Sequence, residues 1–178
     1  NSNCLHDSEE CLAVYLNEHA GFIGRIGDQW YYHLAEWEEG IGGFHCCDLD
    51  GGNDKIVGHF PHWKGDGLVL FYDQVCVLDT WDVQYDEADE EVTGNISGIY
   101  RFHLDTGECE TLCPERETEN GPAYRLCGKY GNDLFYTVRE GERSVLKQMD
   151  LETKELTEPF GNGYSIGAEM EGNYLLCR

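Results

Sequence analysis

Acids gathered in one short segment are the residues of this chain best suited to chemistry. Residues 79–91 read Asp-Thr-Trp-Asp-Val-Gln-Tyr-Asp-Glu-Ala-Asp-Glu-Glu. Hard cations such as Ca²⁺ prefer many oxygen ligands, so a calcium site is predicted from the acids of this segment: Asp79, Asp82, Asp86, Glu87, Asp89 and Glu90. The segment has neither the spacing nor the central glycine of an EF-hand loop. A solvated acidic loop is therefore the alternative interpretation.

Histidines and cysteines suggest a second metal. His59-Phe60-Pro61-His62 places two histidines close together, and His45-Cys46-Cys47 precedes them in the chain. Imidazole and thiolate are ligands that zinc prefers, so His59 and His62 are candidate zinc ligands. Cys46 and Cys47 cannot both join them easily, because neighbouring residues of a strand point to opposite faces.

Two clusters that combine aromatic rings with acids are candidate binding surfaces. Trp81, Tyr85 and Asp86 lie within the acidic segment, and aromatics inside polar rims are typical of interface hot spots. Trp37 lies among the acids of residues 36–39, where a ring beside a carboxylate pair suits a sugar and a glycosidase-like site. Packing of Trp81 on its own sheet and a solvated loop around Trp37 are the respective alternatives. No residue is assigned a catalytic role.

The elements that must position these residues recur along the chain. A strand, a turn that contains an aspartate and a second strand occur four times, with turn aspartates at Asp7, Asp50, Asp105 and Asp150. Aspartate and glycine are the residues that such turns require. A polar turn followed by an aromatic-rich strand precedes the later hairpins, at residues 27–32, 67–72 and 131–136, and recurs at 172–176. These strands have the composition of a half-buried β-ribbon.

One repeat of about 40–45 residues with four strands has the size of a β-propeller blade. The chain is therefore predicted to be all-β, a β-propeller of about four blades of four antiparallel strands, or a segment of a larger propeller. The predicted parts are a half-blade at 1–20, a blade at 21–60, a blade at 61–113 with an acidic insertion at 79–95, a blade at 121–160 and a half-blade at 161–178. The insertion is expected to be a long loop between the second and third strands of its blade.

The repeats resemble a known family. Trp30-Tyr31-Tyr32 and Leu70-Phe71-Tyr72, each followed after roughly 20–30 residues by Leu-Asp-Gly-Gly or Leu-Asp-Thr-Gly, are similar to the repeats of YWTD-type β-propellers, whose bacterial relatives resemble the TolB propeller. The resemblance covers about residues 5–176, and no copy has the full Tyr-Trp-Thr-Asp string. It implies binding of a protein or peptide without catalysis, on a ring that in the family usually has about six blades.

The composition narrows the range of partners. Hydrophobic residues form 40% of the chain, enough to build a core, so general disorder is excluded. The 35 acids and 12 bases give a net charge of -23. This charge repels phosphate backbones and anionic membrane surfaces, so no nucleic acid is expected as a partner. No apolar run approaches the ~18 residues of a membrane span, so no membrane insertion is expected.

These observations predict a non-enzymatic protein- or ligand-binding or scaffold module, monomeric or homodimeric, whose protein or peptide partner is preferably basic. A propeller enzyme that acts on glycans is the alternative. Nine cysteines, an odd number, lie mostly inside predicted strands. That pattern favours reduced thiols and a cytoplasmic location, with an extracytoplasmic one left open. No cofactor other than calcium is indicated.

Overall fold

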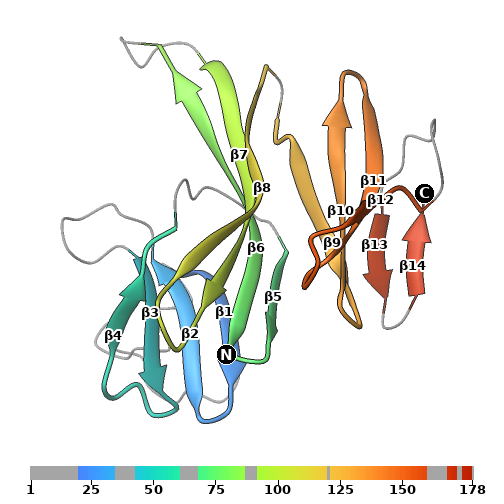
Figure 1. Cartoon of the computed structure of the whole chain (residues 1–178). Helices are drawn as coiled ribbons and strands as arrows, with labels where there is room; N and C mark the ends of the chain where they lie inside the picture. Colours follow the sequence, from blue (N-terminus) through green and yellow to red (C-terminus); the bar gives the residue numbers. More distant parts are fainter. Residues whose placement is uncertain are drawn as a thin grey trace. The chain divides into compact units, whose positions relative to one another are not determined.

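The structure is a computed structural model that describes residues 20–34, 43–60, 68–86, 92–119, 121–159, 168–171 and 174–177. These residues form strands and turns, and they contain no helix (Figure 1). The predicted all-β class is therefore confirmed for this part of the chain. Over the same ranges, nothing has the length and apolar character of a membrane-crossing helix.

Three four-stranded antiparallel sheets contain most of the strands. Within each of these sheets, neighbouring strands follow one another in the chain (Figure 1). The first sheet contains β1 (Ala20–Ile26), β2 (Gln29–Leu34), β3 (Gly43–Asp48) and β4 (Lys55–Gly58). The second contains β5 (Val69–Tyr72), β6 (Val75–Tyr85), β7 (Val92–His103) and β8 (Cys109–Thr118). The third contains β9 (Tyr124–Tyr130), β10 (Asp133–Glu140), β11 (Arg143–Asp150) and β12 (Leu156–Thr157).

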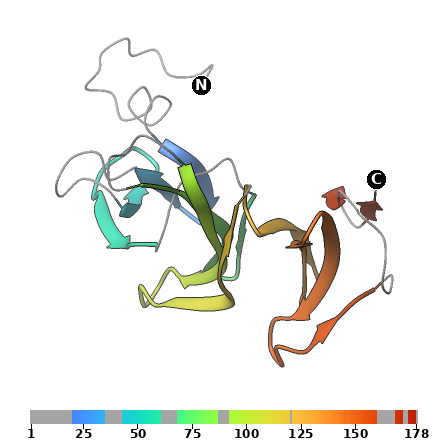
Figure 2. The same ribbon diagram turned by 90° about the horizontal axis from the view of Figure 1, so that it is seen from above.

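A smaller sheet pairs β13 (Ala168–Glu171) with β14 (Tyr174–Cys177). Residues 1–19 of the predicted N-terminal half-blade lie outside the described residues. Within the third sheet the strands are twisted relative to one another (Figure 2), as the sterics of L-residues require.

A turn aspartate occupies a similar place in each four-stranded sheet, at or just after the end of the third strand. Asp50 Oδ1 accepts a hydrogen bond from the backbone amide two residues further on, at 2.9 Å. Asp105 Oδ1 accepts one from the next amide at 3.0 Å, and Asp150 Oδ1 one from the amide three residues on at 2.7 Å. These bonds hold the turns by satisfying backbone donors. The predicted aspartate turns are confirmed at these three places, and Asp7 lies outside the described residues.

The second sheet begins one strand later in the chain than the repeat pattern predicts. Segment 67–72 is expected to match the strands at 27–32 and 131–136, but it supplies β5, a first strand, whereas β2 and β10 are second strands. The matching turn is Asp73-Gln74, with φ angles of 42° and 61°. Glycine is the usual residue in such a backbone and aspartate one of the few others that tolerate it, so the turn has no glycine to mark it.

The expectation that segment 79–95 is a loop is wrong for residues 79–85 and 92–95. β6 continues to Tyr85 and β7 begins at Val92, so the segment extends two neighbouring strands. It does lie between the second and third strands of its sheet, as expected. The alternation of Trp81, Val83 and Tyr85 with polar residues has the period of a strand, and this pattern explains the extension.

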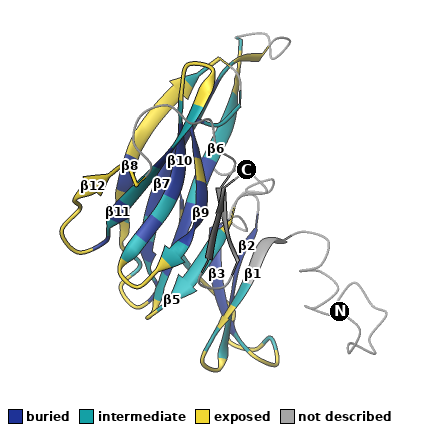
Figure 3. Cartoon of the chain, turned by 90° about the vertical axis from the view of Figure 1, so that its right-hand side faces the viewer, coloured by how far each residue is buried: buried dark blue, intermediate teal, exposed yellow. Residues whose placement is uncertain are grey.

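Several strands are buried on both faces of their sheets. Tyr32 and Cys47 lie on one face of the first sheet with exposed fractions of 1% and 0%, and Tyr31 and Phe44 lie on the other with 4% and 0%. Buried residues also follow one another in β7, β9 and β10, where Figure 3 shows dark blue, whereas β8 and β12 are largely exposed. Strands of this kind need cover on both sides of the sheet.

The chain divides into two compact units. The first comprises Asn1–Trp63, Phe71–Cys76 and Phe102–Cys109, and its core is aromatic. The ring centroid of Phe44 is 5.2 Å from that of Phe60 and 5.1 Å from that of Phe102. Gly58 leaves room for the Phe102 ring, because a Cβ on Gly58 would lie 2.4 Å from it. Offset and edge-to-face rings at such distances attract one another beyond their burial.

The second unit comprises Lys64–Leu70, Val77–Arg101 and Glu110–Arg178. Within it, side chains of the second sheet accept hydrogen bonds from β9, the edge strand of the third sheet, and from the residue that precedes it. Ser97 Oγ accepts the amide of Ala123 at 2.7 Å, and Asp79 Oδ2 accepts the amide of Leu126 at 3.1 Å. These acceptors satisfy donors that an edge strand would otherwise present to solvent or to another chain.

Candidate binding pocket

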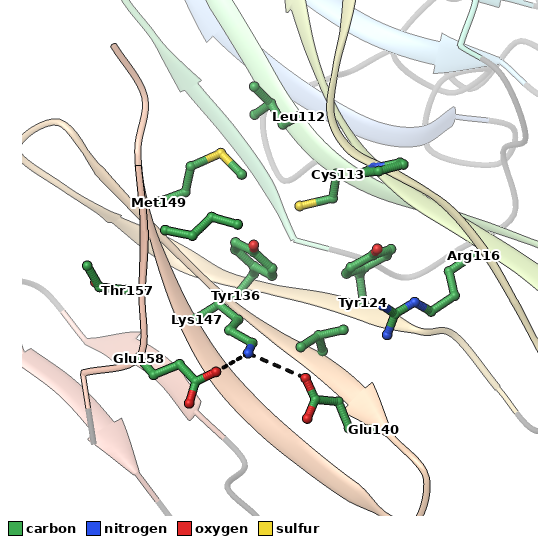
Figure 4. A pocket seen from close by; sticks show the side chains of 13 residues that line it. Leu112, Cys113, Arg116, Tyr124, Tyr136, Glu140, Lys147, Met149, Thr157 and Glu158 are labelled. Carbon is green, nitrogen blue, oxygen red and sulfur yellow. Dashed lines mark hydrogen bonds and ion pairs between the residues drawn. The ribbon is translucent and has the colours of Figure 1, made fainter. Parts of the chain in front are cut away.

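A pocket of about 330 Å³ lies in the second unit (Figure 4). Cavities of about 300–1,000 Å³ are typical of ligand sites, so this one is small. β8 and the strands of the third sheet line it, through Leu112, Cys113, Pro114, Arg116, Tyr124, Tyr136, Val138, Glu140, Lys147, Met149, Leu156, Thr157 and Glu158.

The register of the third sheet brings these side chains to one face. Tyr136 and Lys147 are direct cross-strand partners, and so are Met149 and Leu156. Alternate residues of a strand share a face, so Glu140 lies on the same face of β10 as Tyr136. The exposed fraction rises from 3% for Tyr136 to 51% for the Glu140 side chain. The pocket therefore changes from a buried floor to a charged mouth.

The floor consists of buried apolar and aromatic side chains: Leu112, Cys113, Tyr124, Tyr136, Val138 and Met149. The rings of Tyr124 and Tyr136 meet edge to face with centroids 6.2 Å apart, and the side chains of Cys113 and Tyr136 are hydrogen-bonded. The Arg116 guanidinium lies 5.8 Å from the centre of the Tyr124 ring, which is within reach of a cation–π interaction.

The titratable groups of the floor are neutral at pH 7. Burial raises the pKa of the Cys113 thiol to about 11, although the Tyr136 hydroxyl and the Arg116 charge oppose the change. Burial also raises the pKa values of Tyr136 and Tyr124 above their ordinary range. The thiolate is the nucleophilic form of cysteine, so this floor is suited to recognition rather than to nucleophilic attack.

Three charged side chains form the mouth: Glu140, Lys147 and Glu158. Lys147 Nζ lies 3.4 Å from Glu140 Oε1 and also donates a hydrogen bond to Glu158 Oε1 (Figure 4). The bond to Glu158 is the main reason that the pKa of Lys147 is raised. The exposed fractions of the Lys147 and Glu158 side chains are 18% and 34%, so the lysine stem packs below the carboxylates.

The aromatic residues predicted to bind a partner lie elsewhere. Trp81 and Tyr85 share one face of β6, because their residue numbers differ by an even number and alternate strand residues lie on the same face. Trp81 is partly buried, Tyr85 is 47% exposed, and Asp86 directly follows the strand. None of the three lines the pocket, and Trp37 lies outside the described residues. Their role in binding stays a prediction.

The acids of the predicted calcium site do not converge where the structure describes them. Asp79 and Asp82 point to opposite faces of β6, because their residue numbers differ by an odd number and successive strand residues alternate between faces. Asp79 accepts the amide of Leu126 at 3.1 Å, and Asp82 accepts the next amide of its own strand at 2.8 Å. No group of three or more His, Cys, Asp or Glu among the described residues is placed to hold a metal ion. The other predicted ligands lie outside those residues: Glu87, Asp89 and Glu90.

The predicted zinc ligands are only half described. His59 is exposed after β4, and His62 lies outside the described residues. His45 is buried, with Nδ1 3.3 Å from the Asp54 carboxylate and its ring stacked on Tyr32 at 5.1 Å. Asp54 also accepts the Tyr32 hydroxyl at 2.7 Å. His45 is thus held by a carboxylate and a ring within its sheet.

The six cysteines whose side chains are described are free thiols: Cys46, Cys47, Cys76, Cys109, Cys113 and Cys127. All except Cys109 are buried. The small, weakly polar thiol packs well in such positions. All six lie inside strands as free thiols, as expected, and Cys109 differs from the others only in its exposure.

The residues of the pocket carry no obvious motif, because β8 to β12 each contribute only a few of them. One signal was present in β10, where Tyr136, Val138 and Glu140 pass from aromatic to aliphatic to charged at alternate positions. A strand that changes in this way runs from a core to a surface. The pattern does not reveal which neighbouring strand lies opposite.

The prediction of no catalytic residue overlooked one motif. Ser165 lies in Gly163-Tyr164-Ser165-Ile166-Gly167, which has the form G-x-S-x-G. In a nucleophile elbow this sequence joins a strand to a helix. These residues lie outside the described ones.

No family model matches the chain, and no curated protein matches its sequence. Function is therefore inferred from the sheets and the pocket themselves.

Proposed function

We propose that this chain is a β-propeller, or a segment of one, that binds a protein or peptide without catalysis. Three features support the propeller: each of the three larger sheets is a four-stranded meander, several strands are buried on both faces, and a turn aspartate recurs at one place in each of these three sheets. Blades are sheets that pack face to face, so they need two buried faces. The similarity to YWTD-type repeats agrees with this interpretation.

The pocket is the observation that carries the binding role. A neutral floor with Tyr124, Tyr136 and Met149 offers apolar surface to one large side chain, and the charged mouth surrounds it. Interfaces gain most of their energy where an anchor side chain fills such a pocket. The size of about 330 Å³ fits a side chain or a small molecule better than a folded surface.

The net charge of -23 favours a basic partner. A field of this sign raises the encounter rate with cationic chains and repels anionic ones. We therefore take the partner to be a basic segment of a protein or a free peptide, with a large apolar side chain as its anchor.

Filling the pocket tests the binding role. Thr157 is exposed and lines the pocket, so Thr157→Trp should fill it with little effect on the core. Thr93 is an exposed strand threonine that does not line the pocket, and Thr93→Trp is the matched control. A random peptide library displayed on phage would be selected on the unmodified protein. We expect selected peptides that share a large apolar residue, bind the control and fail to bind Thr157→Trp. Equal binding to both variants would exclude the pocket as the site.

An experimental structure tests the propeller separately. We expect the sheets to radiate from one axis, with β1, β5 and β9 innermost. Sheets stacked as a sandwich would refute the propeller and leave the pocket-filling result unaffected.

A further inference from the structure

Two carboxylates at the mouth of the pocket share one lysine. Glu140 and Glu158 both contact Lys147 Nζ, so the three side chains together carry one excess negative charge. The carboxylate side chains are 51% and 34% exposed, against 18% for Lys147. The acids therefore face solvent at the entrance, where a ligand would pass, and Figure 4 shows both of them directed toward the lysine.

We propose that Glu140 and Glu158 bind a cationic group of the ligand, and that Lys147 occupies this cation site in the free protein. The inference rests on the proposed peptide-binding function, which it makes more specific. The ligand would be a peptide with an arginine or lysine beside a large apolar residue. The apolar residue lies on the floor, and the basic one takes over the carboxylates from Lys147.

Arginine suits this site better than lysine. Its planar guanidinium has several donors and is less strongly hydrated than an ammonium, so it can bond two carboxylates at once. Lys147 can give up its bonds at modest cost, because ion pairs with partly exposed carboxylates are weak. The released ammonium remains on its flexible stem at the edge of the pocket.

An anionic ligand would be opposed by the same groups. The other cation that lines the pocket, Arg116, lies over the Tyr124 ring and donates to the carbonyl of Arg139 at 3.3 Å. An anion would approach two carboxylates through the field of a chain with net charge -23. The arrangement thus selects by charge sign as well as by apolar size.

Three matched probes test the inference by calorimetric titration. They are the amides of N-acetyl-Trp-Arg, N-acetyl-Trp-Gln and N-acetyl-Trp-Glu, which differ only in the charge beside the anchor. We expect the arginine probe to bind about tenfold more tightly than the glutamine probe, which corresponds to two partly exposed ion pairs. The glutamate probe should bind most weakly.

Variants of the mouth give the decisive comparison. Lys147→Met keeps the apolar stem and vacates the carboxylates, so it should raise the affinity for the arginine probe about threefold to tenfold and leave the glutamine probe unchanged. Glu158→Gln should lower the affinity for the arginine probe until it equals the affinity for the glutamine probe. Lys55→Met and Glu108→Gln, at exposed positions outside the pocket, make the same changes in net charge and serve as controls.

Each outcome has one meaning when the unfolding midpoints of the variants match that of the unmodified protein. Glu140→Gln replaces Glu158→Gln if the latter fails to fold. Equal affinity of all three probes would overturn the cation site and leave pocket binding intact. Weaker binding of the arginine probe to Lys147→Met would show that Lys147 is no competitor. Absence of binding by every probe, together with equal phage-peptide binding to Thr157→Trp and its control, would overturn the proposed function itself.

Discussion

Replacement of Asp79 by asparagine should stabilise this protein at neutral pH. The carboxyl lies on β6 and accepts the amide of Leu126 at 3.1 Å. Burial raises its pKa from the ordinary 3.8 to about 6, and the Leu126 amide and the Arg125 charge offset part of that effect. At pH 7 the folded protein thus holds an ionised carboxyl where water solvates it poorly.

The pH dependence follows from the sign of this change. Below pH 3.8 the carboxyl is protonated in the folded and the unfolded chain, and it imposes no penalty. As the pH rises from 3.8 to about 6, the unfolded chain releases its proton first and the stability falls, and above that range the loss is complete. A tenfold change in proton affinity is worth about 1.4 kcal/mol, so ionised Asp79 should cost the folded state about 3 kcal/mol at pH 7.

Urea denaturation of the unmodified protein and of Asp79→Asn at pH 4 and pH 7 measures the effect. Asparagine keeps an oxygen that can accept the Leu126 amide, and it carries no charge. We expect the free energy of unfolding of the variant to gain about 2–3 kcal/mol relative to the unmodified protein between pH 4 and pH 7.

Asp28→Asn is the matched control, because the Asp28 side chain is 97% exposed. Its difference from the unmodified protein should change little with pH. A difference for Asp79→Asn that is the same at pH 4 and pH 7 would refute the reasoning. Addition of CaCl2 distinguishes the predicted calcium role, which requires stabilisation of the unmodified protein and none of the variant.

Phe44→Ala should lower the free energy of unfolding by about 3–5 kcal/mol in urea titration, because the ring is fully buried; a loss below about 1 kcal/mol would contradict its place in the core. Gly58→Ala should cost about 1–3 kcal/mol, since the new Cβ would meet the Phe102 ring at 2.4 Å. Gly141→Ala has open space and a φ of 66°, so it should cost only about 1 kcal/mol, and equal losses would show that steric contact is not the cause. Iodoacetamide should modify Cys109 before the other cysteines whose side chains are described, because only Cys109 among them is exposed; peptide mapping that finds equal rates would contradict the burial.

Local signals were sufficient to predict the strand class and most turns. Asp50, Asp105 and Asp150 were recognisable because an aspartate side chain bonds to amides within a few residues of itself. The second sheet was misaligned by one strand because the turn at Asp73 and Gln74 adopts left-handed backbone without a glycine. The acidic segment has the charge of a solvated loop, and this composition masks the strand alternation of Trp81 and Tyr85.

The candidate site depended on information that no short segment contains. Lys147 meets Tyr136 through the β10–β11 register, and it meets Glu158 through the short pairing of β12 with β11. A slip of one residue would move each of these side chains to the other face of the sheet. Cys113 is brought to the same pocket from β8, which belongs to another sheet.

The sequence by itself determined the all-β class, the repeated aspartate turns and the strongly acidic charge, because propensity, turn chemistry and charge act over a few residues or over the whole composition. Only the tertiary structure decided that Asp79 is buried against the amide of Leu126 and that Glu140 and Glu158 converge on one lysine. Burial and ion pairing arise from strands that are distant in the chain and adjacent in space. Their register depends on the packing of all the neighbouring side chains at once.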